Sequence, residues 1–225
     1  AAVAEALLKE NIFFIQNLSD LLGLDQQQLI KLLCFFISLH DLGKFASAFQ
    51  MIFADKISLL FEPSAGIKPY DGKNFRHDRL GFHFWKKVEE QVLDYVVSEE
   101  ELEDDDQAFD ALQTLAELVL GHHGKPINTD GSFELKSYLE PQNEQAASVF
   151  VEEMLALFQP NIPGYLLGDE SWHARLKQVS WHLAGLTVLA DWLGSNTEFF
   201  PYETEPMPLE DYWLQAQHKA KHALT

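Results

Sequence analysis

The sequence is short of cysteine, of positive charge and of long apolar runs, and each shortage excludes a class of protein. Cys34 is the only cysteine among 225 residues, so the chain cannot form a disulfide within itself, and we expect a reducing, cytoplasmic setting. Lysine and arginine number 16 against 35 aspartates and glutamates, which gives a net charge of −19. A chain this acidic does not bind nucleic acid merely by neutralising phosphates with basic side chains, although bound metal ions can supply positive charge locally. No apolar run reaches the roughly 18 residues of a membrane span, so we expect no membrane partner.

Strand-like alternation, internal repeats and a glycine-rich phosphate loop of the GxxxxGK[ST] type are also missing. Hydrophobic residues still make up 47% of the chain, with 17 Phe and 5 Trp, which indicates a packed core. Helical periodicity dominates, and we predict one all-α domain over residues 1–225. The acidic run Ser98–Asp110 is expected to be a solvated loop and residues 54–74 a connector. The expected helices span 1–18, 26–41, 45–53, 77–97, 107–120, 144–158, 170–193 and 209–223, with Asp25 and Gln28 forming a capping box and Asp106 an N-cap.

One apolar helix ends in a polar motif, "HDLGK". We expect His40 and Asp41 to lie on its last turn, with Gly43 as the helix terminator. A buried aspartate is costly unless it is paired with a cation or bound to a metal. Asp41 therefore requires compensation from elsewhere in the chain.

Further metal-type residues stand at other helix ends. His77 opens a helix in "FRHDRLG", His122 and His123 follow one in "LGHHGK", and Asp191 ends one in "LADWLGSN". Glycines on both sides of the histidine pair, Gly121 and Gly124, allow the backbone to bend so that both rings can serve one site. Each motif is weak alone, because a lone histidine is more often a core or surface residue. Together, imidazoles and carboxylates suit Mn, Fe, Co, Ni or Zn rather than Mg.

In this order, the four motifs resemble those of the HD nuclease of type I CRISPR interference systems, the nuclease half of the CRISPR-associated HD nuclease–helicase. The likeness is greatest to the type I-E branch and covers nearly the whole chain. It implies an all-α HD-domain helical bundle with a dinuclear site for two divalent transition-metal ions (Mn, Fe, Co or Ni). By this resemblance His40, Asp41 and Asp191 hold one ion, and Asp41 bridges to a second ion held by His77, His122 and His123.

The resemblance also implies the substrate and the partners. The family degrades single-stranded DNA that the helicase feeds in, after the crRNA-guided Cascade surveillance complex has marked foreign DNA. The family's first metal ligand is a histidine just upstream of the segment that corresponds to "AAVAEALL", and helicase motifs are missing from this chain. We therefore expect an HD domain taken from a longer chain that continues into the helicase, with a stand-alone nuclease subunit as the second interpretation.

The two-metal reaction gives the individual residues their expected roles. Two ions held close together need a bridging anion, and Asp41 is assigned as this catalytic residue. Lys44 either holds the scissile phosphate or assists the leaving oxygen, or is simply an exposed lysine at a helix C-terminus. Ser195 either supports a metal ligand or contacts substrate, or merely stops its helix.

Other histidines and other functions are weighed against this interpretation. Helix geometry turns His83 and His182 away from the site, and His173 is expected too far along the helix of Asp191. His218 and His222 are expected on a surface helix.

The alternative functions are an HD phosphohydrolase acting on nucleotides or cyclic dinucleotides, and a non-catalytic interaction module. The "HHG" and "ADWLGSN" motifs count against the first, and the nearly complete set of ligand-type residues counts against the second.

Overall fold

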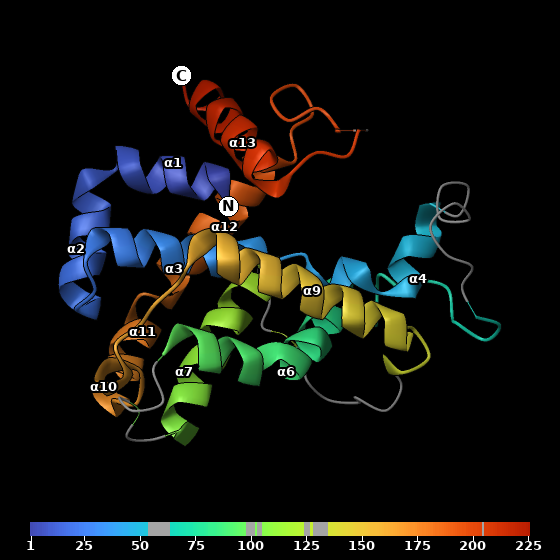
Figure 1. The fold of residues 1–225 in the computed structure, drawn as a ribbon, viewed down its shortest axis with the longest axis horizontal. Helices are drawn as coiled ribbons and strands as arrows, with labels where there is room; N and C mark the ends of the chain where they lie inside the picture. Colours follow the sequence, from blue (N-terminus) through green and yellow to red (C-terminus); the bar gives the residue numbers. More distant parts are fainter. Residues whose placement is uncertain (54–63, 98–101, 103–104, 124–126, 128–134, 204) are drawn as a thin grey trace.

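The structure is a computed structural model that describes residues 1–225 except 54–63, 98–101, 103–104, 124–126, 128–134 and 204. The described residues form helices and no strand, so the all-α prediction is confirmed (Figure 1). No helix among them is long and apolar enough to cross a membrane. The elements are α1 (Ala2–Glu10), α2 (Ile12–Leu22), α3 (Gln26–Ser38), η1 (Leu42–Phe45), α4 (Ser47–Gln50), η2 (Met51–Phe53), α6 (His77–Val96), α7 (Asp105–Leu120), α9 (Pro141–Phe158), α10 (Gly164–Leu167), α11 (Glu170–Gln178), α12 (Ser180–Gly194) and α13 (Leu209–Ala223).

Helix α3 runs through the middle of the bundle and ends at the motif that carries Asp41 (Figure 1). It begins with the predicted capping box: Gln28 N donates to Asp25 Oδ1 at 2.9 Å, and Asp25 N donates to Gln28 Oε1 at 3.2 Å. Its apolar residues are buried almost all round, and it packs against α1, α2, α7 and α9. A helix surrounded in this way is held rigidly, so its C-terminal end is a firm support for a site.

The prediction of one helix over residues 1–18 is wrong, because the chain turns at Asn11. The Asn11 side chain caps α2 by accepting a hydrogen bond from Phe14 N at 3.1 Å. Asparagine is a preferred N-cap residue, and here that preference outweighs the continuous apolar periodicity. The break folds α2 away from α1 and brings α2 beside α3 and α11.

The single helix predicted for 170–193 is also two helices, α11 and α12, which meet at Val179. His173 consequently does not share a straight helix with Asp191, and the separation expected from helix rise does not apply. The His173 side chain is instead buried between helices, with Nε2 2.8 Å from Thr114 Oγ1 of α7. This contact joins α11 to α7.

Three smaller boundaries differ from the predictions. Helix α7 is described from Asp105, so Asp106 lies inside its first turn and is not its N-cap. Of the acidic run predicted as a loop, residues 105–110 are helical, while 98–101 and 103–104 lie outside the described residues. Acidic side chains in a first turn are favoured by the helix dipole. Helix α9 begins at Pro141, earlier than the predicted Glu144, because Pro is favoured at the first helical position. The connector is described only from residue 64 onward.

The buried His173 gives a pH-dependent prediction for stability. Burial, followed by the charge of Lys177, lowers the pKa of His173 below its ordinary value of 6.5. Below about pH 6.5 the His173 side chain is therefore protonated more readily in the unfolded chain than in the folded one. The free energy of unfolding then falls with decreasing pH, by at most about 1.4 kcal/mol per pH unit. Denaturant titrations from pH 8 to 5 should show a shallower slope for His173→Gln, while the exposed control His218→Gln keeps the parent slope. Equal slopes for both variants would contradict the assignment.

Candidate metal centre

The HD motif lies in a tight turn after α3, not on its last turn as predicted. Helix α3 ends at Ser38, and the backbone tightens there, with Leu39 N donating to Phe36 O and His40 N to Ile37 O. Such i to i−3 bonds satisfy carbonyls at a helix end and stop the helix without a glycine. Gly43 lies inside η1, so its assignment as the helix terminator is wrong. The turn leaves the His40 and Asp41 side chains free to point at other helix ends.

The first group of potential ligands combines this turn with the C-terminal end of α12. His40 Nε2 lies 3.2 Å from Asp41 Oδ2 and 3.3 Å from Asp191 Oδ1. One ligand atom from each of the three residues lies within 4.8 Å of the others. His40 Nδ1 is 2.8 Å from the carbonyl of Ile37, which orients the ring so that Nε2 faces the carboxylates.

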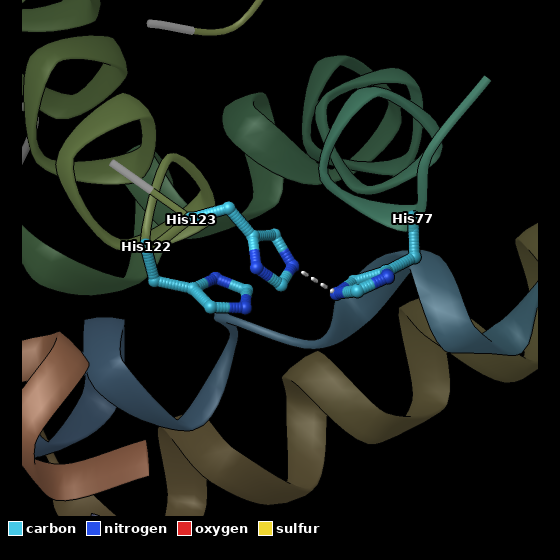
Figure 2. A group of neighbouring side chains, drawn as sticks. All are labelled: His77, His122 and His123. Carbon is cyan, nitrogen blue, oxygen red and sulfur yellow. Dashed lines mark hydrogen bonds between the residues drawn. The ribbon is translucent and has the colours of Figure 1, made fainter. Parts of the chain in front are cut away.

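The second group joins the N-terminus of α6 to the turn that follows α7 (Figure 2). His123 Nε2 and His77 Nε2 lie 2.8 Å apart, and the His122 and His123 rings have their centroids 4.0 Å apart. The chain leaves α7 at Leu120, so the two neighbouring histidines diverge less than they would in a helix and face the same space. Gly121 lies in this turn, whereas Gly124 lies outside the described residues.

Two of these rings also have a hydrogen-bond partner on their Nδ1 atom, which fixes the orientation of the ring. His122 Nδ1 lies 3.1 Å from the Val119 carbonyl, and His77 Nδ1 lies 3.3 Å from the Tyr70 hydroxyl. The same Tyr70 oxygen accepts a hydrogen bond from His77 N at 3.0 Å. Metal-binding histidines usually have such a partner on the second ring nitrogen. No sequence motif points to Tyr70, which stands in the connector before α6.

Asp41 lies between the two groups. Its Oδ2 faces His40 at 3.2 Å, and its Oδ1 faces His77 at 3.4 Å. The His122 ring adjoins both sides, with centroid separations of 5.0 Å to His40 and 5.6 Å to His77. One carboxylate thus presents one oxygen to each group.

The charge states of the two groups differ. Burial lowers the pKa of His77 to about 4, and burial also lowers the pKa of His122 and that of His123. These three rings are therefore neutral at pH 7, the form that binds a metal. Burial acts on His40 in the same direction, but hydrogen bonds with Asp191 and Asp41 outweigh it and raise the pKa of His40 to about 9, so binding of an ion by His40 must release its proton.

The carboxylates have lowered pKa values. Burial raises the pKa of Asp41, but hydrogen bonds with His40 and Lys44 outweigh it and hold the pKa well below its usual range. The hydrogen bond from His40 likewise lowers the pKa of Asp191. Both side chains are anionic at neutral pH and suited to binding cations.

A backbone contact sets the spacing between the HD turn and His77. A Cβ placed on Gly43 would lie 1.7 Å from the His77 carbonyl oxygen and 2.6 Å from Gly81 N. A Cβ on Gly81 would in turn lie 3.1 Å from Gly43 N. The η1 turn therefore rests directly on the first turns of α6, an approach that only glycine permits.

Lys44 and Ser195 lie beside these groups. Lys44 Nζ is 2.5 Å from Asp41 Oδ2, and the lysine side chain is 43% exposed. Ser195 is the C-cap of α12, and its hydroxyl donates to the backbone carbonyl of Asp191 at 2.7 Å, not to the Asp191 carboxylate.

The remaining histidines lie elsewhere. His83 Nε2 is 3.0 Å from Glu144 of α9. Across the described residues, the groups of three or more His, Cys, Asp or Glu that could share an ion are the two given above, so His173, His182, His218 and His222 join neither. Four imidazoles and two carboxylates form a donor set that fits divalent transition metals, so the residues present suit the ions that the motifs predict.

A family model described as "Cas3, HD domain" matches residues 1–200 of the chain. The chain belongs to the Cas3 HD domain family. The CRISPR-associated endonuclease/helicase Cas3 of Escherichia coli (strain K12) is 28% identical over 248 residues; the match covers all of this chain and 26% of that protein. The predicted resemblance to the CRISPR HD nuclease, including the type I-E likeness, is confirmed, and membership supports a CRISPR-associated nuclease domain.

Solved Cas3 structures share the fold. The Thermus thermophilus Cas3 HD domain, solved in the presence of Ni²⁺, has a TM-score of 0.64 and 19% identity, covering 99% of this chain and 80% of that one. T. fusca Cas3 with ATP has a TM-score of 0.64 and 18% identity, covering 99% of this chain and 23% of that one. The chain spans about a quarter of the length of the curated Cas3 relative.

Proposed function

We propose that this Cas3 HD domain is a metal-dependent nuclease that hydrolyses phosphodiester bonds of single-stranded DNA during CRISPR interference against foreign DNA. The observation that carries the proposal is the placement of Asp41, with one oxygen toward each of two ligand groups. In this proposal His40, Asp41 and Asp191 hold one ion, while His77, His122 and His123 hold the second together with Asp41. When bound, a pair of divalent ions supplies a nucleophile at neutral pH and neutralises charge on the phosphate.

The protein groups around the ions hold them in position. Asp41 would offer one oxygen to each ion, and its lowered pKa keeps it charged in the working pH range. Tyr70 and the carbonyls of Val119 and Ile37 orient three ligand rings. Loss of such outer partners typically costs 10–100-fold in metal affinity or activity.

Two further side chains take supporting roles. Lys44 is paired with Asp41 and open to solvent, so we assign its ammonium to a phosphate oxygen of the substrate. Ser195 binds the carbonyl of Asp191 and so holds the end of α12 that presents this carboxylate. Both are assigned from position, and neither is a metal ligand.

The relatives support the setting that we propose. The E. coli relative is an endonuclease/helicase of which this chain matches 26%. We assign residues 1–225 to the HD nuclease domain of a nuclease–helicase system, with the helicase in the same chain or in a partner chain. The helicase delivers the single strand in the cytoplasm, after crRNA-guided Cascade has marked the target. The donor set favours Mn, Fe, Co or Ni as the ions.

The substrate class is tested with one panel. The chain, loaded with Mn²⁺ or Ni²⁺, is incubated with single-stranded DNA, duplex DNA, deoxynucleotides and a cyclic dinucleotide, and each product is quantified. We expect cleavage of the single strand above the duplex, and weak binding of both, because a −19 chain makes few phosphate contacts. Chelation with EDTA should stop the reaction. Consumption of nucleotides or cyclic dinucleotides without DNA cleavage would establish a phosphohydrolase instead.

A further inference from the structure

A groove between α7 and α12 lies outside the ligand groups. It has a volume of about 430 Å³, within the range of pockets that bind small organic molecules. Its walls are mostly apolar. The lining side chains used below are Glu117, Leu118 and Gly121 of α7 and the turn after it, and Trp181, Gly185 and Val188 of α12.

Two of the lining residues lie close in sequence to residues of the metal centre. Gly121 immediately precedes His122, and Val188 stands one helical turn before Asp191. Trp181 lies two turns further from Asp191, on the same face of α12. The Val188 and Gly121 end of the groove is therefore within about one helical turn of the residues assigned to the ions, while Trp181 stands about 15 Å from Asp191 along α12.

The chemistry of the walls selects a flat, uncharged group. No lysine or arginine lines the described part of the groove, so a phosphate finds no cation there. The Trp181 side chain is 81% exposed, which makes its indole face available for stacking. Glu117 adds a carboxylate acceptor of the kind that binds exocyclic amino groups of bases.

We propose that this groove binds one unpaired base of the DNA strand, next to the scissile phosphate, with the base stacked on Trp181. The proposal rests on the nuclease function proposed above. Stacking of a base on an aromatic ring does not depend on charge. The groove therefore provides affinity for DNA that an acidic chain does not obtain from contacts with phosphates. It also gives a reason for single-strand preference: a paired base cannot enter the groove without being unstacked and extruded.

The test pairs a change in the protein with a change in the DNA. A short oligodeoxycytidylate is compared with versions that carry one abasic residue at each position in turn. Both Trp181→Ala and one abasic position beside the cleaved bond should raise KM, each by roughly 5- to 150-fold, with kcat nearly unchanged. Combining them should add little, because both changes remove the same contact.

Two more variants complete the design. Gly185→Leu places bulk in the groove at a position where the new Cβ meets nothing within 4 Å, and it should raise KM for the intact strand only. Phe13→Ala removes an equally exposed aromatic ring on α2, outside the groove, and should leave KM unchanged. Circular dichroism and metal content are measured for every variant.

The outcomes separate the two proposals. If the parent chain shows no metal-dependent cleavage of any strand, the nuclease function fails and the base site fails with it. If the parent cleaves DNA but Trp181→Ala and Gly185→Leu leave KM unchanged, or raise it equally for intact and abasic strands, the base site alone is overturned.

Discussion

Replacing Asp41 with alanine is expected to abolish metal binding at both ligand groups and to reduce DNA cleavage by more than about a hundredfold. Asp41 faces His40 with one oxygen and His77 with the other, so one substitution removes a ligand from each group. Removing an outer partner of a metal ligand already costs roughly 10–100-fold, and a shared direct ligand should cost more. Metal content by elemental analysis and cleavage of single-stranded DNA measure the two effects.

The matched control for Asp41 is Asp20→Ala. Asp20 is exposed on α2 and belongs to neither ligand group, so this variant makes the same change of charge without touching the centre. It should keep the parent metal content and rate. Asp41 lies in a turn after α3, so Asp41→Ala should preserve the far-ultraviolet circular dichroism. A variant lacking Asp41 that binds two ions and cleaves near the parent rate would refute the shared-ligand assignment.

Gly43→Ala is expected to weaken metal binding without replacing any ligand residue, because it disturbs the backbone contact that supports the centre. The new Cβ would lie 1.7 Å from the His77 carbonyl oxygen and 2.6 Å from Gly81 N, and both obstacles are backbone atoms that no rotamer change can move. Relief requires η1 and α6 to separate, which increases the distance between Asp41 and His77. Overpacking of this kind costs about 3 kcal/mol or more. We expect a lower urea midpoint, together with weaker binding of the ion assigned to His77.

Gly194→Ala is the control for this effect. It makes the same chemical change near the other end of the centre, where the new Cβ meets only Val3 Cγ2, at 3.9 Å. Replacing glycine with alanine in a helix normally stabilises it by about 0.5–1 kcal/mol where space allows. This variant should therefore bind metal as the parent does and be at least as stable. If Gly43→Ala behaves in the same way, the backbone contact does not set the spacing of the centre.

The ordered motifs predicted that six ligand-type residues stand at helix ends, and the structure brings them into two groups, while their role as metal ligands stays a prediction. Each of His40, His77, His122 and Asp191 stands where an apolar helical pattern begins or stops, and in a bundle such ends can meet. Boundaries were harder. Apolar periodicity continues through Asn11 and Val179, and local capping at Asn11 decided the break. A pattern records which faces are buried, but not where a backbone turns.

The supporting contacts could not be predicted, because they depend on tertiary approach. The sequence pattern predicts Gly43 to be a helix terminator, whereas in the structure its lack of a side chain allows the backbone of η1 to contact that of α6. Tyr70 is one aromatic residue in a loop until the fold brings its hydroxyl to His77. The buried hydrogen bond from Ser47 Oγ to Glu140 joins residues far apart in the chain, and neither has a local motif.

The meeting of helix ends also has a consequence for the order of folding. His40 and Asp191 are separated by 151 residues, and closing so long a loop has an entropic cost that precedes any gain from the contact. During synthesis the first 123 residues carry five of the six ligand-type side chains, and α12, which brings the sixth, emerges much later. A nascent or partly unfolded chain therefore lacks the group formed by His40, Asp41 and Asp191, so the proposed nuclease is expected to become competent only once α12 has packed into the bundle.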